Sequence, residues 1–326
     1  MSGAATSKLA VAVTRAGGLG QIGFLDDSRM LSAELERAQG ELQDFISHEQ
    51  SDHVLPIGMG MIVFGSSIPH WLPVISQYKP AVVWLSFGET DEFRQWIESI
   101  RNISPQTKVW VQLGTVNHAV ETAQACHPDA IVLQGSDAGG HGHAHGASVI
   151  SLIPEAADAL KEHGFNDIPL IAAGGIMDGR GIAAAVMLGA VGAVMGTRFL
   201  AAEETSLPSD FRKAVLNASD GGYSTVRSRI FDEIWGPSPW PERYDGRCLR
   251  NSIYENLTKG LPIREVREQF NDMLREKQGW NLDAKDLPSV WAGTGVGMVK
   301  RTEKAGDIVK QVQLQSRTCL ESGKQH

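Results

Sequence analysis

The chain has 326 residues, 42% of them hydrophobic, which is enough to bury the core of one large domain. A formal net charge of −8 argues against the basic surface that nucleic-acid binding requires, so we expect no nucleic-acid partner. The three cysteines form no metal-ligand spacing, no apolar run could span a bilayer and no secretory signal opens the chain, so we expect a cytoplasmic protein without a membrane partner.

From Lys8 to about Leu200, short apolar runs alternate with amphipathic segments. Seven runs are predicted to be strands: Leu19–Phe24, Leu55–Val63, Ala81–Phe87, Lys108–Gly114, Ala130–Gln134, Pro169–Ala173 and Ala193–Phe199. The patterns between them indicate helices at Met30–Leu42, Asp91–Ile100, Val116–Ala125, Pro154–Glu162 and Gly181–Leu188. Strands that are apolar almost throughout are typical of parallel sheets covered on both faces. The alternation therefore predicts an α/β fold with a parallel barrel or a doubly wound sheet.

An eight-stranded barrel needs one strand more than these seven. The chain enters a helix at Ser7–Ala16 almost at once, so the first strand of such a barrel would have to precede Met1. We therefore expect a TIM-type (β/α)8 barrel that lacks its first strand.

After Leu200 the pattern changes. Helices are expected at Ser209–Asn217, at about Pro262–Lys277 and at Ala305–Ser316. Ser224–Trp235 fits either a strand or a helix that leads into a proline-rich turn. We expect residues 1–205 to form the barrel and residues 206–326 to form a lid and C-terminal helices packed on it, all within a single domain.

The most informative motif is the loop Gln134–Gly142, which directly follows an apolar strand. In parallel α/β folds, the loops after the strands build the active site. Gly139 and Gly140 offer bare N–H groups that can closely approach a flat ligand. His141 follows them, and an imidazole with an unperturbed pKa of about 6.5 can act as a base near neutral pH. We predict that His141 is catalytic; the alternative is a solvated histidine after a glycine turn.

His143 and His145 continue the motif at alternating spacing. A metal site is the less favoured interpretation, because Asp137 is the one nearby carboxylate and the segment is rich in glycine and alanine. We expect no metal, and we expect both histidines to lie in an exposed loop.

Two further turns close neighbouring strands with small residues, at Ala173-Gly174-Gly175 and at Met195-Gly196-Thr197. With the first strand absent, these would be the seventh and eighth strands of a barrel, whose following loops commonly bind phosphate through backbone N–H groups. The Thr197 hydroxyl is an additional candidate donor. Phosphate binding is favoured over the alternative that these glycines only make tight turns.

Gln112 and Gln134 lie within or at the end of apolar strands, where an unpaired amide is costly. They either bind a ligand at the barrel mouth or are satisfied locally. The glycine-rich turn Ala16–Gly20 is assigned a structural role, because a helix end commonly takes glycine.

Taken together, these motifs resemble the nitronate monooxygenase family, formerly called 2-nitropropane dioxygenases, from Met1 to about Val312. The resemblance rests on the segments Ala16–Gly20, Gln134–Gly142, Ala173–Ile176, Met195–Phe199 and Ala292–Gly297. A stretch from Trp240 to Asn251 also resembles an insertion seen in many proteins of this kind.

The resemblance implies a TIM barrel that binds FMN and uses His141 as its catalytic histidine. The residues implied to surround FMN are Met1, Gln112, Gln134, Gly139, Gly140, Ala173, Gly174, Gly175, Met195, Gly196 and Thr197. Among them, Met1 corresponds to a methionine at the end of the family's first strand, whose backbone contacts the flavin ring.

The implied activity is the oxidation of alkyl nitronates, and of neutral nitroalkanes, by O₂ to a carbonyl compound and nitrite. Two alternatives stay open: a flavin-dependent enoyl-thioester reductase that uses NAD(P)H, and a non-catalytic flavin-barrel protein that has degenerated with the loss of its first strand. The physiological substrate is open as well, and so is assembly into a homo-oligomer.

Overall fold

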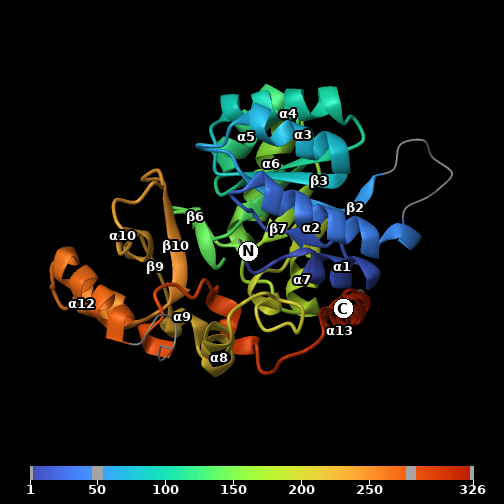
Figure 1. Ribbon diagram of the computed structural model, residues 1–326. Coiled ribbons are helices and arrows are strands. Elements are labelled where there is room, and N and C mark those ends of the chain that lie inside the picture. Colours follow the sequence, from blue (N-terminus) through green and yellow to red (C-terminus); the bar gives the residue numbers. More distant parts are fainter. Residues whose placement is uncertain (1–2, 46–53, 277–283, 324–326) are drawn as a thin grey trace.

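The fold is described by a computed structural model that covers residues 3–45, 54–276 and 284–323. Its main feature is a curled parallel sheet of seven strands in the order β1-β2-β3-β4-β5-β7-β8 (Figure 1). The strands are β1 (Gln21–Ile22), β2 (Leu55–Ile62), β3 (Pro80–Ser86), β4 (Lys108–Leu113), β5 (Ala130–Gln134), β7 (Leu170–Ala173) and β8 (Gly192–Val194). The predicted TIM-barrel-like α/β fold is confirmed, and within the described ranges β1 and β8 are the two edges of this sheet.

Alternating side chains of the strands build two separate layers. Leu85, Val111 and Ile131 lie side by side across β3, β4 and β5, point outwards and are fully buried against the helices. On the inner face, the neighbouring row contains Trp84 and Trp110, whose rings are 6.5 Å apart and pack with Val132 and Ile171. These rings pack in the barrel one row below Gln112, on the side of the amino-terminal ends of the strands.

Helices cover the outside of the sheet (Figure 1). They are α1 (Ser7–Arg15), α2 (Ser28–Glu41), α3 (Ile68–Tyr78), α4 (Thr90–Ile103), α5 (Val116–Cys126), α6 (Val149–Glu162) and α7 (Gly179–Met187), with a short 3₁₀ turn at Gln43–Phe45. The sequence patterns missed α3, which contains Pro73 as well as a proline in its first turn. A proline inside a helix removes one hydrogen bond, and here the buried Trp71 and Ile75 on the same helix offset that loss.

The glycine turn after α1 has the structural role that was predicted. Gly17 adopts a positive φ of 87°, and its N–H donates to the carbonyl of Thr14. A side chain at Gly20 would overlap the backbone of Ala10. The turn therefore directs the chain from α1 into β1.

A second, antiparallel sheet stands beside the carboxyl ends of the barrel strands (Figure 1). It consists of β6 (Gly140–His143), β10 (Tyr244–Leu249) and β9 (Thr225–Ser228), in that order. The prediction of a loop is therefore wrong for Gly140–His143, because pairing with a strand about one hundred residues later was invisible in local patterns. Ser224–Trp235 contains both predicted alternatives, since β9 is followed by the one-turn helix α10 (Ile230–Glu233).

Helices complete the second half of the chain. They are α8 (Ser209–Asn217), α9 (Gly221–Ser224), α11 (Ser252–Thr258), α12 (Ile263–Glu276) and α13 (Ala305–Gly323), with 3₁₀ turns at Thr197–Phe199, Ala284–Asp286 and Thr294–Met298. Buried Asn251 connects two of these parts, because its side chain accepts from the N–H of Tyr254 and donates to the carbonyl of Leu287. In the described ranges, no helix is long and apolar enough to cross a membrane. The division into barrel and lid at residue 205 stays a prediction.

The last helix, α13, packs against α7 and α1 on the outer side of the barrel. Just before it, the Glu303 carboxylate accepts a 2.6 Å hydrogen bond from Arg198, which follows β8. Burial opposes ionisation of Glu303, but hydrogen bonds from Arg198 and Arg301 outweigh it and lower the pKa of this carboxyl. The ion pair thus fastens the C-terminal segment to the end of β8.

We expect Glu303→Gln to lower the free energy of unfolding at pH 7 by about 1–3 kcal/mol, because Arg198 loses its charged partner. The pKa of Glu303 is lower in the folded protein than in the unfolded chain. Its ionised carboxylate therefore stabilises the fold at pH values above the unfolded pKa, and this stabilisation is lost as the pH falls through the folded pKa. Urea unfolding should therefore show a gap between wild type and variant at pH 7 that shrinks in acid. An equal gap at both pH values would contradict this assignment, and Glu321→Gln, at the exposed end of α13, serves as the control.

Candidate active site

The turns after β7 and β8 present free backbone donors at the carboxyl end of the sheet. Gly174 and Gly175 adopt positive φ values of 105° and 72°, a conformation that favours glycine. Among the described residues, no acceptor receives the N–H groups of Gly174, Gly175, Gly196 or Thr197. Such N–H groups at the ends of parallel strands can bind an anion, and we call this set of four groups the cradle.

Three glycine-rich segments pack closely around this cradle. A side chain at Gly139 would overlap the backbone of Ala292 and Gly293, and one at Gly175 would press on Asp137. The Gly293 N–H donates to the Thr197 hydroxyl over 2.9 Å. The Thr197 hydroxyl oxygen therefore has a structural role, because it accepts the hydrogen bond from Gly293. Its O–H proton stays available for the donor role predicted from the sequence.

Two further hydrogen bonds hold the same segment in place. The N–H of Thr294 donates to the carbonyl of Asp137 over 3.0 Å, and its hydroxyl donates to the Asp137 carboxylate over 3.0 Å. Ala292, Gly293 and Thr294 thus pack against the segments that carry the cradle, although sequence reasoning assigned them no role.

Gln112 and Gln134 lie on the inner face of the barrel, above the tryptophan layer. In register, Gln112 is next to Ser86 and Val132, and Gln134 is next to Ala173. Both side chains are half-buried, and neither amide has a hydrogen-bond partner among the described residues. Each can therefore donate to, and accept from, a ligand at the mouth of the barrel.

The other residues that were predicted to surround FMN differ in position and in the direction of their side chains. Ala173 is buried on the inner face, whereas Met195 packs outwards among the helices. Gly140, with a φ of 77°, pairs with Arg247 across the small sheet and leaves open space where a side chain would stand. Met1 lies outside the described residues.

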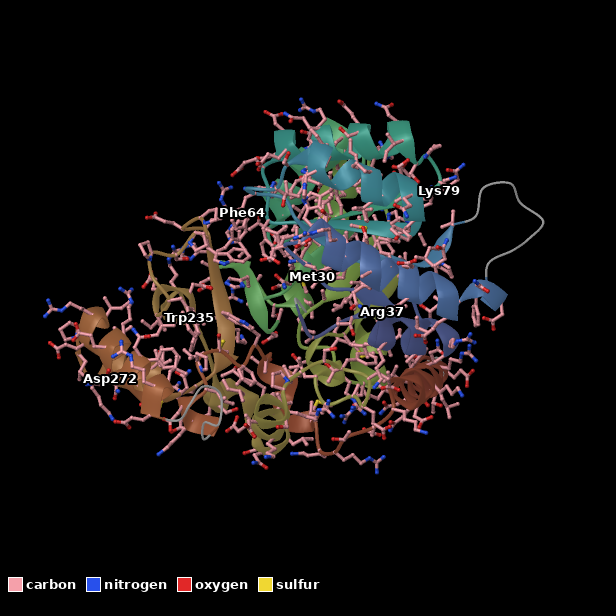
Figure 2. All side chains as sticks on the ribbon, viewed as in Figure 1. Met30, Arg37, Phe64, Lys79, Trp235 and Asp272 are labelled. Carbon is pink, nitrogen blue, oxygen red and sulfur yellow. The ribbon has the colours of Figure 1, made fainter. Side chains whose placement is uncertain are left out.

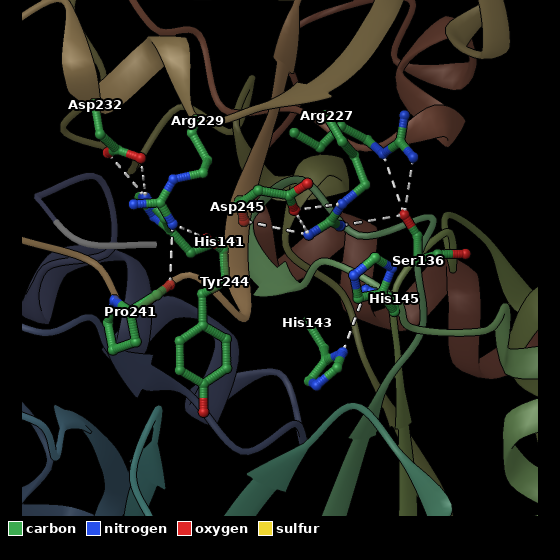
Figure 3. Close-up of polar contacts among 11 residues, drawn as sticks. Ser136, His141, His143, His145, Arg227, Arg229, Asp232, Pro241, Tyr244 and Asp245 are labelled. Carbon is green, nitrogen blue, oxygen red and sulfur yellow. Dashed lines mark hydrogen bonds and ion pairs between the residues drawn. The ribbon is translucent and has the colours of Figure 1, made fainter. Parts of the chain in front are cut away.

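His141 points to the side of the small sheet that carries α10 (Figure 3). Its Nε2 lies 2.9 Å and 3.0 Å from the two carboxylate oxygens of Asp232. The ring is stacked on Trp240 at a centroid distance of 3.7 Å and an interplanar angle of 9°, and Trp291 lies at 4.6 Å. The predicted solvated alternative does not fit, since the His141 side chain is only 15% exposed.

Aromatic side chains extend from His141 to the ends of β2 and β3. Trp240 contacts Phe64 and Phe87 edge-on, each at 4.9 Å, and Phe64 lies on the side of the barrel that faces β10 (Figure 2). Burial raises the pKa of Tyr244, which packs on Phe87, to about 12, so its phenol stays neutral. These rings make an apolar wall beside the imidazole.

Two arginines lie on the face of β10 opposite His141, and Figure 3 labels one of them, Arg227. Arg227 and Arg247 are cross-strand neighbours, and both donate to the carbonyl of Ser136, Arg247 over 3.0 Å. Arg227 is also paired with Asp245. Burial and the neighbouring Arg227 lower the pKa of Arg247. The two guanidinium groups hold the loop that leads from β5 to Gly139.

The other histidines of the motif differ from each other. His143 belongs to β6, is half-buried and packs against Tyr244, so the prediction of an exposed loop is wrong for this residue. Burial lowers the pKa of His143, and His145 lowers it further. His145 is exposed, as predicted. No cluster of potential metal ligands occurs among the residues that the structure covers.

Comparison with known proteins identifies the family. The family model described as nitronate monooxygenase matches residues 53–315. This chain belongs to the nitronate monooxygenase family. A nitronate monooxygenase from Metarhizium robertsii is 37% identical over 320 residues, covering 96% of this chain and 88% of that protein. A nitronate monooxygenase from Neurospora crassa is 36% identical, covering 94% of this chain and 85% of its own length. Membership in the family makes this chain an oxidoreductase.

Solved structures agree with the fold. FabK from Thermotoga maritima superimposes with a TM-score of 0.74 at 24% identity, covering 99% of this chain and 93% of FabK. A nitroalkane oxidase from Streptomyces ansochromogenes superimposes with a TM-score of 0.72 at 25% identity, covering 98% of this chain and 94% of that one. This nitronate monooxygenase family member thus shares its fold with both solved structures.

We expect Thr197→Val to destabilise the cradle, because the Gly293 N–H then loses its acceptor at a cost of about 1–3 kcal/mol. Thr197→Ser keeps the hydroxyl and should retain most of the stability. Hydrogen exchange at the Gly293 amide measures the effect, with faster exchange in the valine variant than in the serine variant. Equal exchange in both variants would show that the hydroxyl does not hold this segment.

Proposed function

We propose that this protein binds FMN and oxidises alkyl nitronates with O₂, giving a carbonyl compound and nitrite, and that His141 extends this activity to neutral nitroalkanes. Family membership supports the nitronate substrate. The observation that carries the choice of cofactor is the set of unpaired N–H groups after β7 and β8.

The cradle fits a phosphate monoester. The N–H groups of Gly174, Gly175, Gly196 and Thr197 have no partner in the described ranges, and the Thr197 O–H can join them. A phosphate needs several donors in a concave arrangement, and glycines admit its oxygens to the backbone. Gln112 and Gln134 lie on the inner face, and their amides have no partner in the part of the chain that the structure covers, so they suit the polar edge of a flat ring.

The protein's own contribution is to position the substrate, exclude water and move a proton. When bound, FMN supplies the redox chemistry by accepting electrons from the nitronate and passing them to O₂. A nitronate is already deprotonated, so its oxidation needs no base. A neutral nitroalkane must first lose the proton on the carbon next to its nitro group, and His141 is the base that we assign to this step. The aromatic wall of Trp240, Phe87 and Phe64 keeps water away from the imidazole.

We expect His141→Ala to lower kcat/KM for a neutral nitroalkane by about 10²- to 10⁴-fold, the usual range for loss of a general base. Turnover of the preformed nitronate should change little, and bound FMN should be retained. Steady-state oxygen consumption with both forms of one nitroalkane measures the difference. His145→Ala, an exposed histidine of the same segment, is the control, and undiminished nitroalkane turnover in His141→Ala would remove His141 from this role.

We expect Gly196→Asp to reduce FMN retention, because a carboxylate in the cradle repels the phosphate and occupies its place. The backbone of Gly196, with a φ of −100°, tolerates a side chain. Gly40→Asp introduces the same charge in open space on α2 and should leave retention unchanged. Absorbance of the purified proteins and titration with FMN measure occupancy; full occupancy in Gly196→Asp would refute the phosphate assignment.

A further inference from the structure

The contact between His141 and Asp232 defines which imidazole nitrogen can accept a proton. A carboxylate only accepts hydrogen bonds, so the Nε2 atom that faces both of its oxygens must carry the hydrogen. In neutral histidine the other nitrogen then holds the lone pair. Among the described residues, Nδ1 of His141 has no hydrogen-bond partner, so this lone pair is available.

We propose that Asp232 is the positioning residue of the active site, which holds His141 in the Nε2–H tautomer so that Nδ1 serves as the base toward neutral nitroalkanes. This inference rests on the proposed function of His141. Asp232 does not itself touch the substrate in this scheme, and it acts through the imidazole.

Burial and partner choice support this role. The Asp232 side chain is only 12% exposed, and His141 is its one charged or hydrogen-bonding side-chain partner within the described ranges. A carboxylate in such surroundings needs a donor, because burying it without one is costly. His141 meets that need only when the hydrogen is on Nε2. The Asp232 carboxylate therefore selects the Nε2–H tautomer of His141, and His141 supplies the donor that the buried carboxylate needs.

The surrounding structure keeps both groups in place. Asp232 lies on α10, whose neighbouring residues Ile230 and Phe231 are buried in the hydrophobic cluster behind the small sheet. Arg229 donates to the carbonyls of Trp240 and Pro241 over 3.0 and 3.1 Å and so holds the backbone that carries the indole stacked on the imidazole; Figure 3 shows its contact with Pro241. The ring can neither rotate freely nor exchange its two nitrogens without disturbing this stack.

The proton transfer then follows directly. Nδ1 of His141 takes the proton from the carbon next to the nitro group, and the electron pair of the broken C–H bond moves into the nitro group to give the nitronate. His141 becomes an imidazolium that still donates through Nε2 to the Asp232 carboxylate, which stabilises the new positive charge. No electrons are exchanged with a cofactor in this step.

The first test reads the tautomer on the protein itself. In ¹⁵N-labelled holoenzyme at a pH where His141 is neutral, imidazole ¹⁵N shifts should show hydrogen on Nε2, with the His141 signals assigned from a His141→Gln sample. In Asp232→Asn the signals should move toward a mixture of tautomers, because an amide can either donate or accept. Hydrogen on Nδ1 in the wild type would overturn the proposal, whatever the enzyme's activity.

The second test separates positioning from folding. Asp232→Asn should lower kcat for the neutral nitroalkane by at least about tenfold, but by less than the loss of the base itself, and should leave nitronate turnover nearly unchanged. The matched control is Asp167→Asn, which removes a carboxylate 3.0 Å from Nε2 of His127 on the surface. Equal losses with both substrates, or no loss with either, would overturn the proposal. A wild type without nitronate turnover would instead overturn the proposed function, while the tautomer measurement still decides the role of Asp232.

Discussion

Close packing of backbone on backbone at the carboxyl ends of β5, β7 and β8 is the constraint on which the site depends. Gly139 touches Ala292 and Gly293, and Gly293 in turn lies against the backbone of Asp137, so a side chain at either glycine would force the segments apart. The hydrogen bond from Gly293 to Thr197 ties the same segment to the turn after β8. This packing holds the turns in conformations in which the N–H groups of Gly174, Gly175, Gly196 and Thr197 find no acceptor within the described part of the chain. That is a cost unless a ligand or water supplies one.

β10 divides the site into two chemically different faces. Arg247 donates to the Ser136 carbonyl and Asp245 pairs with Arg227 on one face, whereas Tyr244 and Gly246 share the face of His141. Strand periodicity thus separates the arginines that hold the loop from the aromatic rings and the Asp232 carboxylate that surround the imidazole. Gly246 is required on the second face, because a side chain there would overlap the ring of Trp291.

Sequence patterns predicted the features that are local and repetitive. The apolar strands, the helices between them and the glycine turns after β7 and β8 each depend on a few consecutive residues, so β5 was placed at its observed bounds. The missed elements depend on distant partners or on context. Local composition around Gly140–His143 suggests a turn, and this segment becomes a strand only because β10 pairs with it. In α3, two prolines concealed a helix that is stabilised by tertiary burial.

The same reasoning explains why Asp232 was missed. It lies 91 residues from His141, on a one-turn helix with no repeating pattern, and its carboxylate has nothing in the sequence to distinguish it from a surface residue. The pair forms because β6 joins β10 in a register that places His141 opposite Gly246, while β9 on the other side of β10 leads directly into α10. A slip of one residue between β6 and β10 would turn His141 toward the arginines and away from Asp232. Strand pairing thus brings together the proposed base and its carboxylate partner, and the contacts of Arg227 and Arg247 with the Ser136 carbonyl hold the loop from which β6 begins.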